Sequence, residues 1–377
     1  MSIKSSNKQL PKVTICVPVR NGACTIQRTL DSLLNQDYPN YEIIVSDNCS
    51  DDDTAKIVTQ YASKGVKYFF NPVVGKWGGA ESNWNHILTL AEGPFIALYH
   101  ADDIYTSTMV RRQVEFLLKY PEASAVFTMT QTIDEYDRPI KMGSTRLPQE
   151  LKSKEILDYA EFLNCTLKYG TFVIVPTMMS RRETIARVGG FSWEKYATAS
   201  DIDLYLRMAK IGSIGVIDEP LHKYRISAQQ GSAQIFYQRT FLAHYFNVLD
   251  DYISRSDVAV MVQKDPLSIY RMRRAADQIH CAMNMLVQGR LVEEKMNLID
   301  ALKYEHIVEA IKMVTIKRPK MLLVFGAGFV LLASSYLGLG TFAAKLMYKL
   351  FQRYSKVQRE PIKAKSWFTS LLSIKTN

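Results

Sequence analysis

Short apolar runs alternate with amphipathic segments in the first part of the chain. The run at residues 13–19 has no polar face, a pattern typical of a strand buried on both sides of a sheet, and further strands are predicted at 41–46, 66–70 and from Ile96. Between them, apolar residues recur at helical spacing, at residues 26–34, 52–61 and in a segment ending at Ala91. Alternation of strand and helix predicts an α/β fold with a parallel sheet and right-handed crossovers.

The pattern changes further along the chain. Up to Arg225, helices are predicted at residues 106–119, 155–167, 181–188 and from Ser200, and strands at 123–130, 172–180, 214–217 and 221–224. After Arg225 the periodicity is helical only, at residues 233–253, 266–288 and 292–313. We therefore predict an α/β domain at 12–227, a helical extension at 228–316 and a basic, hydrophobic tail at 317–377.

Polar residues follow three of the predicted strands directly. The first strand ends in Pro18, Val19, Arg20 and Asn21, the second in Asp47 and Asn48, and the fourth in Asp102 and Asp103. Ligands of open parallel sheets bind outside the carboxyl ends of the strands. We therefore expect these residues to form one site.

Asp102 and Asp103 are adjacent carboxylates at the end of an apolar run. Two such groups repel each other unless a cation or a set of donors compensates their charge. A divalent cation that holds a diphosphate would be such a partner. The alternative is a strand-to-helix turn in which one aspartate caps the helix that starts near Ser107.

Asp201 stands at the start of a predicted amphipathic helix. A carboxylate at a helix N-terminus is stabilised in its ionised form, which suits a proton acceptor. A plain N-cap is the alternative interpretation.

Several classes are excluded by what the sequence lacks. Neither GxGxxG after the first strand nor GxxxxGK[ST] occurs, which argues against a dinucleotide Rossmann site and a P-loop. The five cysteines form no CxxC pair, which argues against a zinc site or a disulfide framework. The polar N-terminus lacks an apolar signal region, so we expect the catalytic part in the cytoplasm.

The basic charge of the chain is confined to its tail. Residues 301–377 contain 13 Lys and Arg and three Glu, whereas the first 300 residues carry 34 charges of each sign. Residues 321–344 carry no charge and are flanked by basic residues. An anionic membrane surface is a better partner for this pattern than a nucleic acid.

The apolar segment is long enough to span a bilayer, but a single span would carry the basic end of the chain across. We therefore favour a hairpin bent near residues 334–340, followed by an amphipathic helix at 345–354. These features predict attachment to the cytoplasmic face of the cell membrane through residues 317–354. A buried hairpin in a soluble oligomer is the alternative.

The order of these motifs resembles that of the family 2 glycosyltransferases, nucleotide-sugar enzymes with the GT-A fold that act with inversion. The resemblance covers about residues 12–227. It rests on the segments at 17–21, 44–51, 91–103, 188–191, 201–204 and 221–225. It implies a Rossmann-like, mostly parallel sheet flanked by helices.

The resemblance also assigns roles to individual residues. Donor binding falls to Pro18, Val19, Arg20, Asn21, Asp47, Asn48 and Asp102. Asp103 and Asp102 match the motif for Mg²⁺ or Mn²⁺, with Asp103 the more direct ligand, and Asp201 matches the general base. The sequence departs from the family at two positions: His100 replaces the first acid of the metal motif, and Ser200 replaces the Glu before the base.

The implied function is transfer of one sugar from a nucleotide-diphosphate sugar to a hydroxyl of a lipid-linked or cell-surface glycan intermediate. Single transfer is favoured because the Gln-x-x-Arg-Trp signature of processive synthases is absent. A non-catalytic nucleotide-sugar-binding scaffold is the alternative, although four matching aspartates argue against it. A nucleotidylyltransferase fits less well, because Arg20-Asn21-Gly22-Ala23 lacks the basic Gly-rich loop of that class.

Overall fold

The structure, a computed structural model, describes residues 10–73, 80–226, 239–289, 293–303 and 320–347. The chain divides into two compact units, residues 1–163 with 171–226 and residues 164–170 with 227–377. The division into domains at 12–227, 228–316 and 317–377 stays a prediction, because both boundaries between these domains lie outside the described segments.

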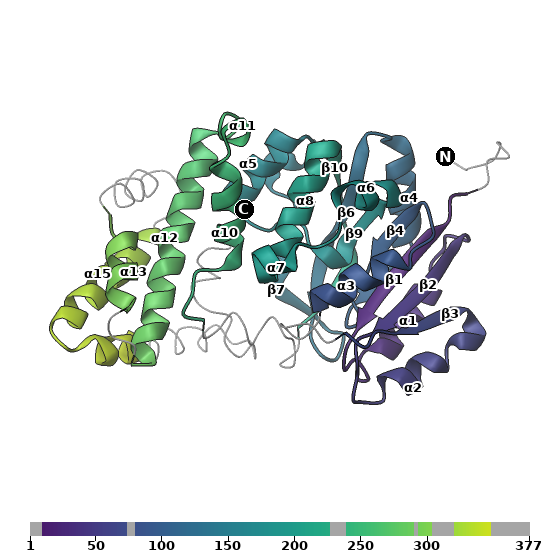
Figure 1. Cartoon of the computed structure of the whole chain (residues 1–377), viewed down its shortest axis with the longest axis horizontal. Helices are drawn as coiled ribbons and strands as arrows, with labels where there is room; N and C mark the ends of the chain where they lie inside the picture. The colour runs from purple at the N-terminus through teal and green to yellow at the C-terminus, as the bar shows by residue number, and fades with distance from the viewer. Residues whose placement is uncertain (1–9, 74–79, 227–238, 290–292, 304–319, 348–377) are drawn as a thin grey trace. The chain divides into compact units, whose positions relative to one another are not determined.

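The first unit contains a ten-stranded sheet and its surrounding helices (Figure 1). Its strands are β1 Val13–Val19, β2 Tyr41–Asp47, β3 Val66–Phe70, β4 Phe95–Leu98, β5 Ile104–Tyr105, β6 Ala123–Ile133, β7 Pro139–Thr145, β8 Ile156–Leu157, β9 Met178–Arg181 and β10 Ser213–Arg225. Its helices are α1 Ile26–Leu34, α2 Thr54–Thr59, α3 Ala80–Thr89, α4 Met109–Lys119, α5 Tyr159–Tyr169, α6 Arg182–Val188, α7 Trp193–Tyr196 and α8 Ser200–Ile211, of which α5 extends into the second unit.

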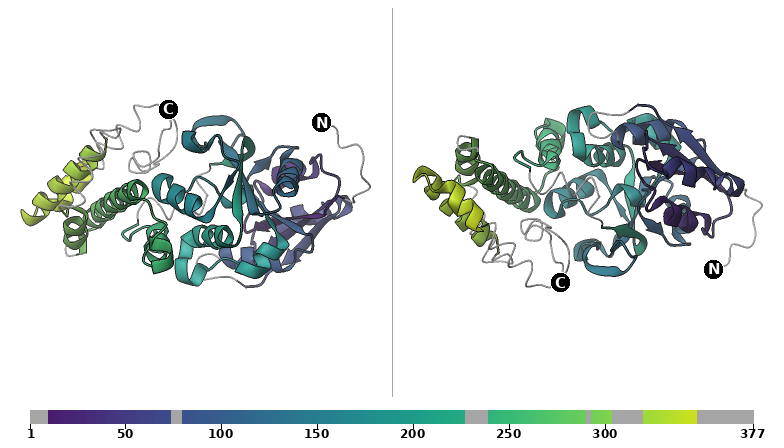
Figure 2. Two further views of the ribbon diagram at one scale, coloured as in Figure 1. Left: turned by 90° about the horizontal axis from the view of Figure 1, so that it is seen from above. Right: turned by 90° about the horizontal axis from the view of Figure 1, so that it is seen from below.

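Helices cover both faces of the sheet (Figure 2). One core cluster joins side chains of α1, α2 and α4 to alternate residues of β1, among them Val13, Ile15 and Val17. On the opposite face α3 contacts β1, where the thiol of Cys16 lies near the carbonyl oxygen of Ile87. All seven residues of β1 are buried, which explains why this strand is apolar throughout.

The strand order is β3-β2-β1-β4-β9-β6-β10-β5. The pairs β3–β2, β2–β1 and β1–β4 are parallel, as the sequence predicts. The prediction of a mostly parallel sheet fails at β9, which lies antiparallel to both β4 and β6, although β6 and β10 again pair in parallel. The sheet is therefore mixed, with a parallel half that contains the ends of β1, β2 and β4.

Several element boundaries also differ from the sequence predictions. The strand expected to deliver Asp102 and Asp103 ends earlier, at Leu98, and a turn follows it. The two strands expected at 214–217 and 221–224 form one strand, β10, whose pairing with β6 is irregular around Pro220. Of the strand expected at 172–180, only the part from Met178 onwards forms a strand, and β7 has no counterpart among the predicted strands.

The second unit is helical. Its helices are α10 His244–Ile253, α11 Ser256–Ala259, α12 Lys264–Val287, α13 Glu293–Ala301 and α15 Lys320–Tyr336. A core of small and apolar side chains joins α12, α13 and α15. Arg239 and Asp277, both buried, form an ion pair that fixes the chain before α10 against α12.

The apolar segment of the tail folds as two helical pieces. After α15 the chain turns at Leu337 and Gly338, where Gly338 has a φ of 73°, and residues 340–347 are again helical. Among the described residues, no helix combines the length and apolar character needed to cross a membrane. Of the amphipathic helix predicted at 345–354, residues 348–354 lie outside the described part of the chain.

Candidate active site

The predicted site lies where the strand order of the sheet reverses, between β1 and β4. From β1 the chain adds β2 and β3 on one side and then returns to place β4 on the other side. Ligands of open α/β sheets bind outside the carboxyl ends of the strands at such a switch point. Pairing of β1 with β4 ends at Cys16 and Leu98, so Pro18 needs no backbone N–H toward β4.

The loops that follow β1 and β2 are bound to each other. The backbone N–H of Asn21 donates to Ser50 Oγ at 2.8 Å, and Asn21 Oδ1 accepts from the N–H of Asp51 at 3.0 Å. Asn21 has a φ of 52°, a left-handed conformation that Asn tolerates better than most residues. Arg20 beside it is exposed. The two loops therefore form one fixed edge.

Asp47 and Asn48 are both buried beneath this edge, with about 1% of each exposed. The Asp47 carboxylate accepts from the Tyr68 hydroxyl at 2.9 Å and from the N–H of Ser50 at 3.0 Å. The Asn48 amide donates to the carbonyl oxygen of Val73 at 2.6 Å. Asn48 Oδ1 is buried without a hydrogen-bond partner in the described residues, so one acceptor remains for a ligand donor.

Asn83 of α3 adds a buried network that the sequence did not reveal. It accepts from the Ser46 hydroxyl at 2.6 Å and donates to the Ser46 carbonyl oxygen at 2.8 Å. Asn71 donates to the same Asn83 Oδ1 at 3.2 Å. These bonds fasten α3 to the end of β2.

The turn after β4 contains the predicted acidic pair. Asp103 is fully buried, and its Oδ1 accepts from the backbone N–H of Arg225 at 2.9 Å. The Arg225 guanidinium donates to the carbonyl oxygen of Asp102 at 2.8 Å. The Thr29 hydroxyl is within 2.9 Å of the Ala101 carbonyl oxygen and 2.8 Å of that of Asp103. The turn is thus held from α1 and from the end of β10.

His222 of β10 lies behind Asp103. Its Nε2 is 2.9 Å from Asp103 Oδ2, and its Nδ1 is 3.1 Å from the Thr130 hydroxyl. The Nε2 and Oδ2 atoms approach closely, but their alignment does not make a regular hydrogen bond. His222 is fully buried, so it supports the acidic pair from within the fold.

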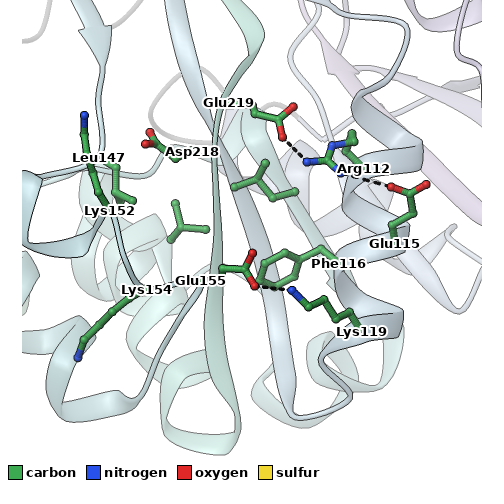
Figure 3. A pocket seen from close by; sticks show the side chains of 12 residues that line it. Arg112, Glu115, Phe116, Lys119, Leu147, Lys152, Lys154, Glu155, Asp218 and Glu219 are labelled. Atoms are coloured by element: carbon green, nitrogen blue, oxygen red, sulfur yellow. Dashed lines mark hydrogen bonds and ion pairs between the residues drawn. The ribbon is translucent and has the colours of Figure 1, made fainter. Parts of the chain in front are cut away.

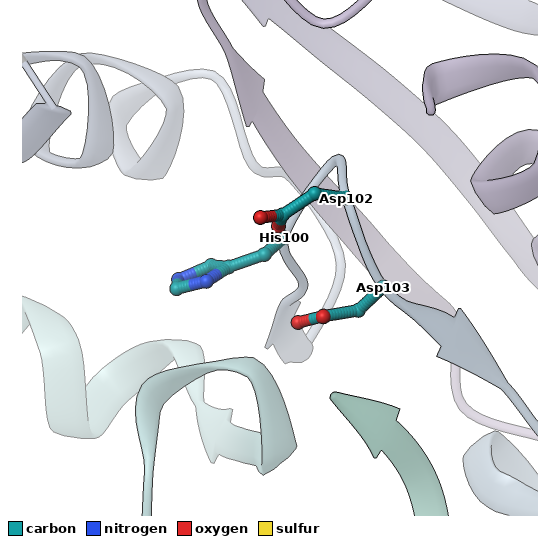
Figure 4. A group of neighbouring side chains, drawn as sticks. All are labelled: His100, Asp102 and Asp103. Carbon is teal, nitrogen blue, oxygen red and sulfur yellow. The ribbon is translucent and has the colours of Figure 1, made fainter. Parts of the chain in front are cut away.

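His100, Asp102 and Asp103 place one ligand atom each within 4.8 Å of one another. Figure 4 shows their side chains extending in the same direction from the turn. The His100 ring stacks on Trp84, with ring centroids 5.3 Å apart, and Trp84 meets Phe191 edge-on at 5.0 Å. His100 Nε2 is buried without a hydrogen-bond partner in the described residues.

Burial controls the charges of this group. It raises the pKa of Asp103 to about 8, an effect that the nearby Arg225 partly offsets. Burial lowers the pKa of His100 to about 4 and that of His222 to about 3, so both rings are neutral at pH 7. A neutral imidazole and ionised carboxylates are ligands that fit a divalent cation, so binding of a cation would release the proton that burial favours on Asp103.

Asp201 lies in the first turn of α8, as the sequence predicts, and is partly exposed. Its Oδ1 accepts from the N–H of Ile202 at 2.8 Å. One turn along, the buried Asp203 pairs with Arg207 at 2.7 Å. Arg207 in turn donates to the carbonyl oxygen of Gly190 at 2.7 Å. The helix that carries Asp201 is thereby fastened to the loop at 188–192.

Asn85 of α3 holds the same loop from the other side. Its amide donates to the Phe191 carbonyl oxygen at 2.9 Å and accepts from the Phe191 N–H at 2.7 Å. Because Phe191 packs on Trp84 and Trp84 stacks on His100, this loop connects α8 to the turn after β4.

Comparison with known proteins agrees with this arrangement. Residues 14–189 match the family described as Glycosyl transferase family 2. This part of the chain belongs to that family. The matched segment is thus a glycosyltransferase domain.

A Rickettsia typhi protein named as an uncharacterized glycosyltransferase is 28% identical over 226 residues, which cover 59% of this chain and 67% of its own length. An Escherichia coli protein, WfgD, is 26% identical over 243 residues, covering 64% of this chain and 86% of its own. It is named as a UDP-Glc:alpha-D-GlcNAc-diphosphoundecaprenol beta-1,3-glucosyltransferase.

Two solved structures share the fold of this glycosyltransferase. S. aureus TarS 1-349 in complex with UDP-GlcNAc has a TM-score of 0.55 at 16% identity, covering 91% of this chain and 92% of its own. The Pyrobaculum calidifontis mannosyltransferase PcManGT in complex with GDP-Man and Mn²⁺ has a TM-score of 0.50 at 17% identity, covering 90% and 87%. At these identities the likeness supports the fold alone.

A cavity of about 400 Å³ elsewhere in the glycosyltransferase domain contains none of the predicted site residues (Figure 3). It lies between α4, the middle of β10 and residues 147–155. Its charges largely neutralise one another, since Arg112 pairs with Glu219 and Lys119 pairs with Glu155. This cavity therefore does not coincide with the predicted site.

The glycosyltransferase domain thus places the predicted donor and metal residues at adjacent strand ends, although their depths differ, whereas Asp201 lies on α8. Asp47, Asn48 and Asp103 are buried, whereas Arg20 is exposed and Asp102 is partly exposed. The residues that sequence reasoning missed are those that hold the site in place. They are Asn83, Asn85, Arg207 and Arg225, each of which binds residues far away in the chain.

Proposed function

We propose that this glycosyltransferase moves one sugar, with inversion, from a nucleotide-diphosphate sugar to a hydroxyl of a lipid-linked or cell-surface glycan intermediate. The observation that carries the proposal is the convergence of His100, Asp102 and Asp103 beside the ends of β1 and β2. The WfgD name supports the acceptor class, because that relative acts on a diphosphoundecaprenol-linked sugar.

The donor lies across the carboxyl ends of β1, β2 and β4 in this proposal. The unpartnered Asn48 Oδ1 accepts a hydrogen bond from the base, beside the edge that Pro18, Val19, Arg20 and Asn21 form. Asp47 fixes the loop that carries Asn48 through its bonds to Tyr68 and Ser50. The diphosphate then points toward Asp102.

Asp102 and Asp103 hold Mg²⁺ or Mn²⁺ at the diphosphate. When bound, the cation stabilises the negative charge that develops on the nucleoside diphosphate as it leaves. Asp103 serves from a buried position, fixed by Arg225 and His222, while Asp102 faces outward. The fixed turn reduces the rearrangement that ligand binding requires.

Asp201 acts as the general base. Inversion in a single displacement requires the acceptor hydroxyl to attack the anomeric carbon from the face opposite the leaving diphosphate. Asp201 takes the proton of that hydroxyl as the new glycosidic bond forms and the bond to the diphosphate breaks. General base assistance of this kind contributes roughly 10² to 10⁴ in rate.

Substitution of the base tests this assignment. Asp201→Asn should bind the nucleotide sugar as the wild type does and lower the turnover number about 10²-fold or more. Asp218→Asn, at an exposed carboxylate of β10, is the matched control and should transfer normally. Transfer by Asp201→Asn at the wild-type rate would show that another group takes the proton.

The tail places the enzyme at the cytoplasmic face of the cell membrane, through residues 317–354. Support comes from a run of exposed apolar side chains around the turn after α15, namely Tyr336, Leu337, Leu339, Phe342 and Leu346. Basic residues flank this segment in the sequence and suit anionic headgroups. Fractionation tests the attachment, since an embedded hairpin should stay with membranes after a high-salt or alkaline wash.

A further inference from the structure

The imidazole of His100 is fixed in place, but its Nε2 atom makes no hydrogen bond in the described residues. Trp84 stacks on one face of the ring, and Trp84 is itself packed against Phe191. The backbone of His100 is held by the Tyr105 hydroxyl, which lies 2.6 Å from its N–H and 3.2 Å from its carbonyl oxygen. The ring nitrogen Nε2 remains buried without a hydrogen bond. Native folds rarely leave such an atom unused.

Two further atoms around the turn share this property. Asp103 Oδ2 and His222 Nε2 are buried, and neither has a regular hydrogen bond among the described residues. Asp103 and His222 are both completely inaccessible to solvent. Asp103 Oδ2 faces His222, and Asp103 and His100 each offer a ligand atom within 4.8 Å of the other at the turn.

The spacing of these atoms suits an ion. His100, Asp102 and Asp103 each place a ligand atom within 4.8 Å of the other two. Adjacent ligands of an octahedral ion with bonds of about 2.1 Å lie about 3 Å apart and opposite ligands about 4 Å, so the turn would close around a bound ion. In Figure 4 no side chain of the group turns away from the others.

Building on the proposed function, we propose that His100 contributes an imidazole nitrogen to the divalent cation held by Asp102 and Asp103. Because the ligand set then contains nitrogen, the site favours Mn²⁺ over Mg²⁺. Imidazole suits transition metals, whereas Mg²⁺ selects oxygen ligands almost exclusively. His100 thus replaces a carboxylate with a ligand of different metal preference.

Pulsed electron paramagnetic resonance of bound Mn²⁺ tests the ligation directly. The full-length protein is loaded with Mn²⁺ in the presence of UDP or GDP, and nitrogen couplings to the ion are recorded. In wild-type protein a ¹⁴N coupling is expected, which changes to a ¹⁵N coupling when histidine alone is labelled with ¹⁵N. This labelling requires no substitution, so it does not depend on the folding of a variant.

Substitution assigns the nitrogen to one histidine. His100→Gln should lose the coupling, whereas His86→Gln, on the neighbouring helix α3, should retain it. Bound Mn²⁺ without a histidine coupling, or a coupling that survives in His100→Gln, would overturn the proposal. Failure of Mn²⁺ to bind at all would overturn it too.

Competition between metals provides a second readout. His100→Asp should lower the ratio of Mn²⁺ to Mg²⁺ affinity by about tenfold or more, measured by calorimetry. An unchanged ratio would contradict the proposal. Sugar transfer measured in parallel distinguishes the metal-ligand role of His100 from the proposed function. If transfer proceeds without nitrogen ligation, only the role of His100 is wrong. Absence of transfer with every donor contradicts the proposed function.

Discussion

The loop at Gly189 to Ser192 offers a sharp test of the connection between α8 and the turn after β4. Asn85 makes two hydrogen bonds to the backbone of Phe191, at 2.7 and 2.9 Å, and Phe191 is 3% exposed. A Cβ added at Gly190 would overlap Asn85 Oδ1 and lie 2.8 Å from Asn85 Cγ. Gly190→Ala should therefore displace the Asn85 side chain and break both bonds.

The expected cost follows from the two bonds. Each contributes about 1 kcal/mol to the free energy of unfolding, so Gly190→Ala and Asn85→Ala should each lower it by about 2 kcal/mol. Because both substitutions remove the same bonds, the double variant should also lose about 2 kcal/mol and not about 4. The coupling free energy is therefore about 2 kcal/mol.

Gly189→Ala is the matched control. Gly189 has a φ of 77°, and a Cβ there would meet nothing within 4 Å. Gly189→Ala should lower the free energy of unfolding by about 1 to 2 kcal/mol, because alanine is strained in the left-handed conformation. In the double variant with Asn85→Ala, the two losses should add. Urea denaturation followed by tryptophan fluorescence measures all five variants. If the losses for Gly190→Ala and Asn85→Ala were additive, the two substitutions would not act on the same hydrogen bonds. If Gly189→Ala were also coupled to Asn85→Ala, overlap of the new Cβ with Asn85 would not be the cause of the coupling.

Three further outcomes are expected in the second unit. Burial lowers the pKa of His280 on α12 to about 4, below the unfolded value of 6.5, so this group should remove stability as the pH falls from about 6.5 to 4. His280→Gln should flatten that part of a plot of melting temperature against pH, and an unchanged slope would contradict it. Asp277→Asn should lower the free energy of unfolding by roughly 3 kcal/mol or more, because Arg239 is left buried without its counter-charge. Calorimetry measures this loss, and a change below about 1 kcal/mol would argue against a buried pair. Leu337→Asp combined with Phe342→Asp should reduce cosedimentation with anionic vesicles, since both side chains are exposed beside the turn after α15. Unchanged cosedimentation would locate the membrane contact elsewhere.

The parts of the fold that the sequence predicts well are those with a local cause. β1 has the predicted bounds because a strand buried in the sheet requires a continuous apolar run with polar punctuation at its ends. β3 also has the predicted bounds, although it is a partly exposed edge strand. The polar clusters at 18–21, 47–48 and 102–103 were found for the same reason. Parallel neighbours bring their carboxyl ends to one edge, so neighbouring clusters in such a sheet meet.

The parts that the sequence does not predict depend on distant partners. An apolar run does not show the direction of its neighbour, so the antiparallel insertion of β9 between β4 and β6 was missed. Burial of Asp103 depends on Arg225 and His222, which follow it by more than a hundred residues. The hydrogen bonds of Asn85 join it to Phe191, which lies 106 residues away in the chain.

The most direct test of the active site is calorimetric titration of nucleotide sugars, with UDP, GDP and dTDP donors, in the presence of Mn²⁺. The wild-type protein should bind at least one donor, Asp103→Asn should lose the part of that affinity that depends on Mn²⁺, and Asp201→Asn should bind like the wild type. Absence of binding by every donor, or Mn²⁺-dependent binding that persists in Asp103→Asn, would contradict the site described at the ends of β1, β2 and β4.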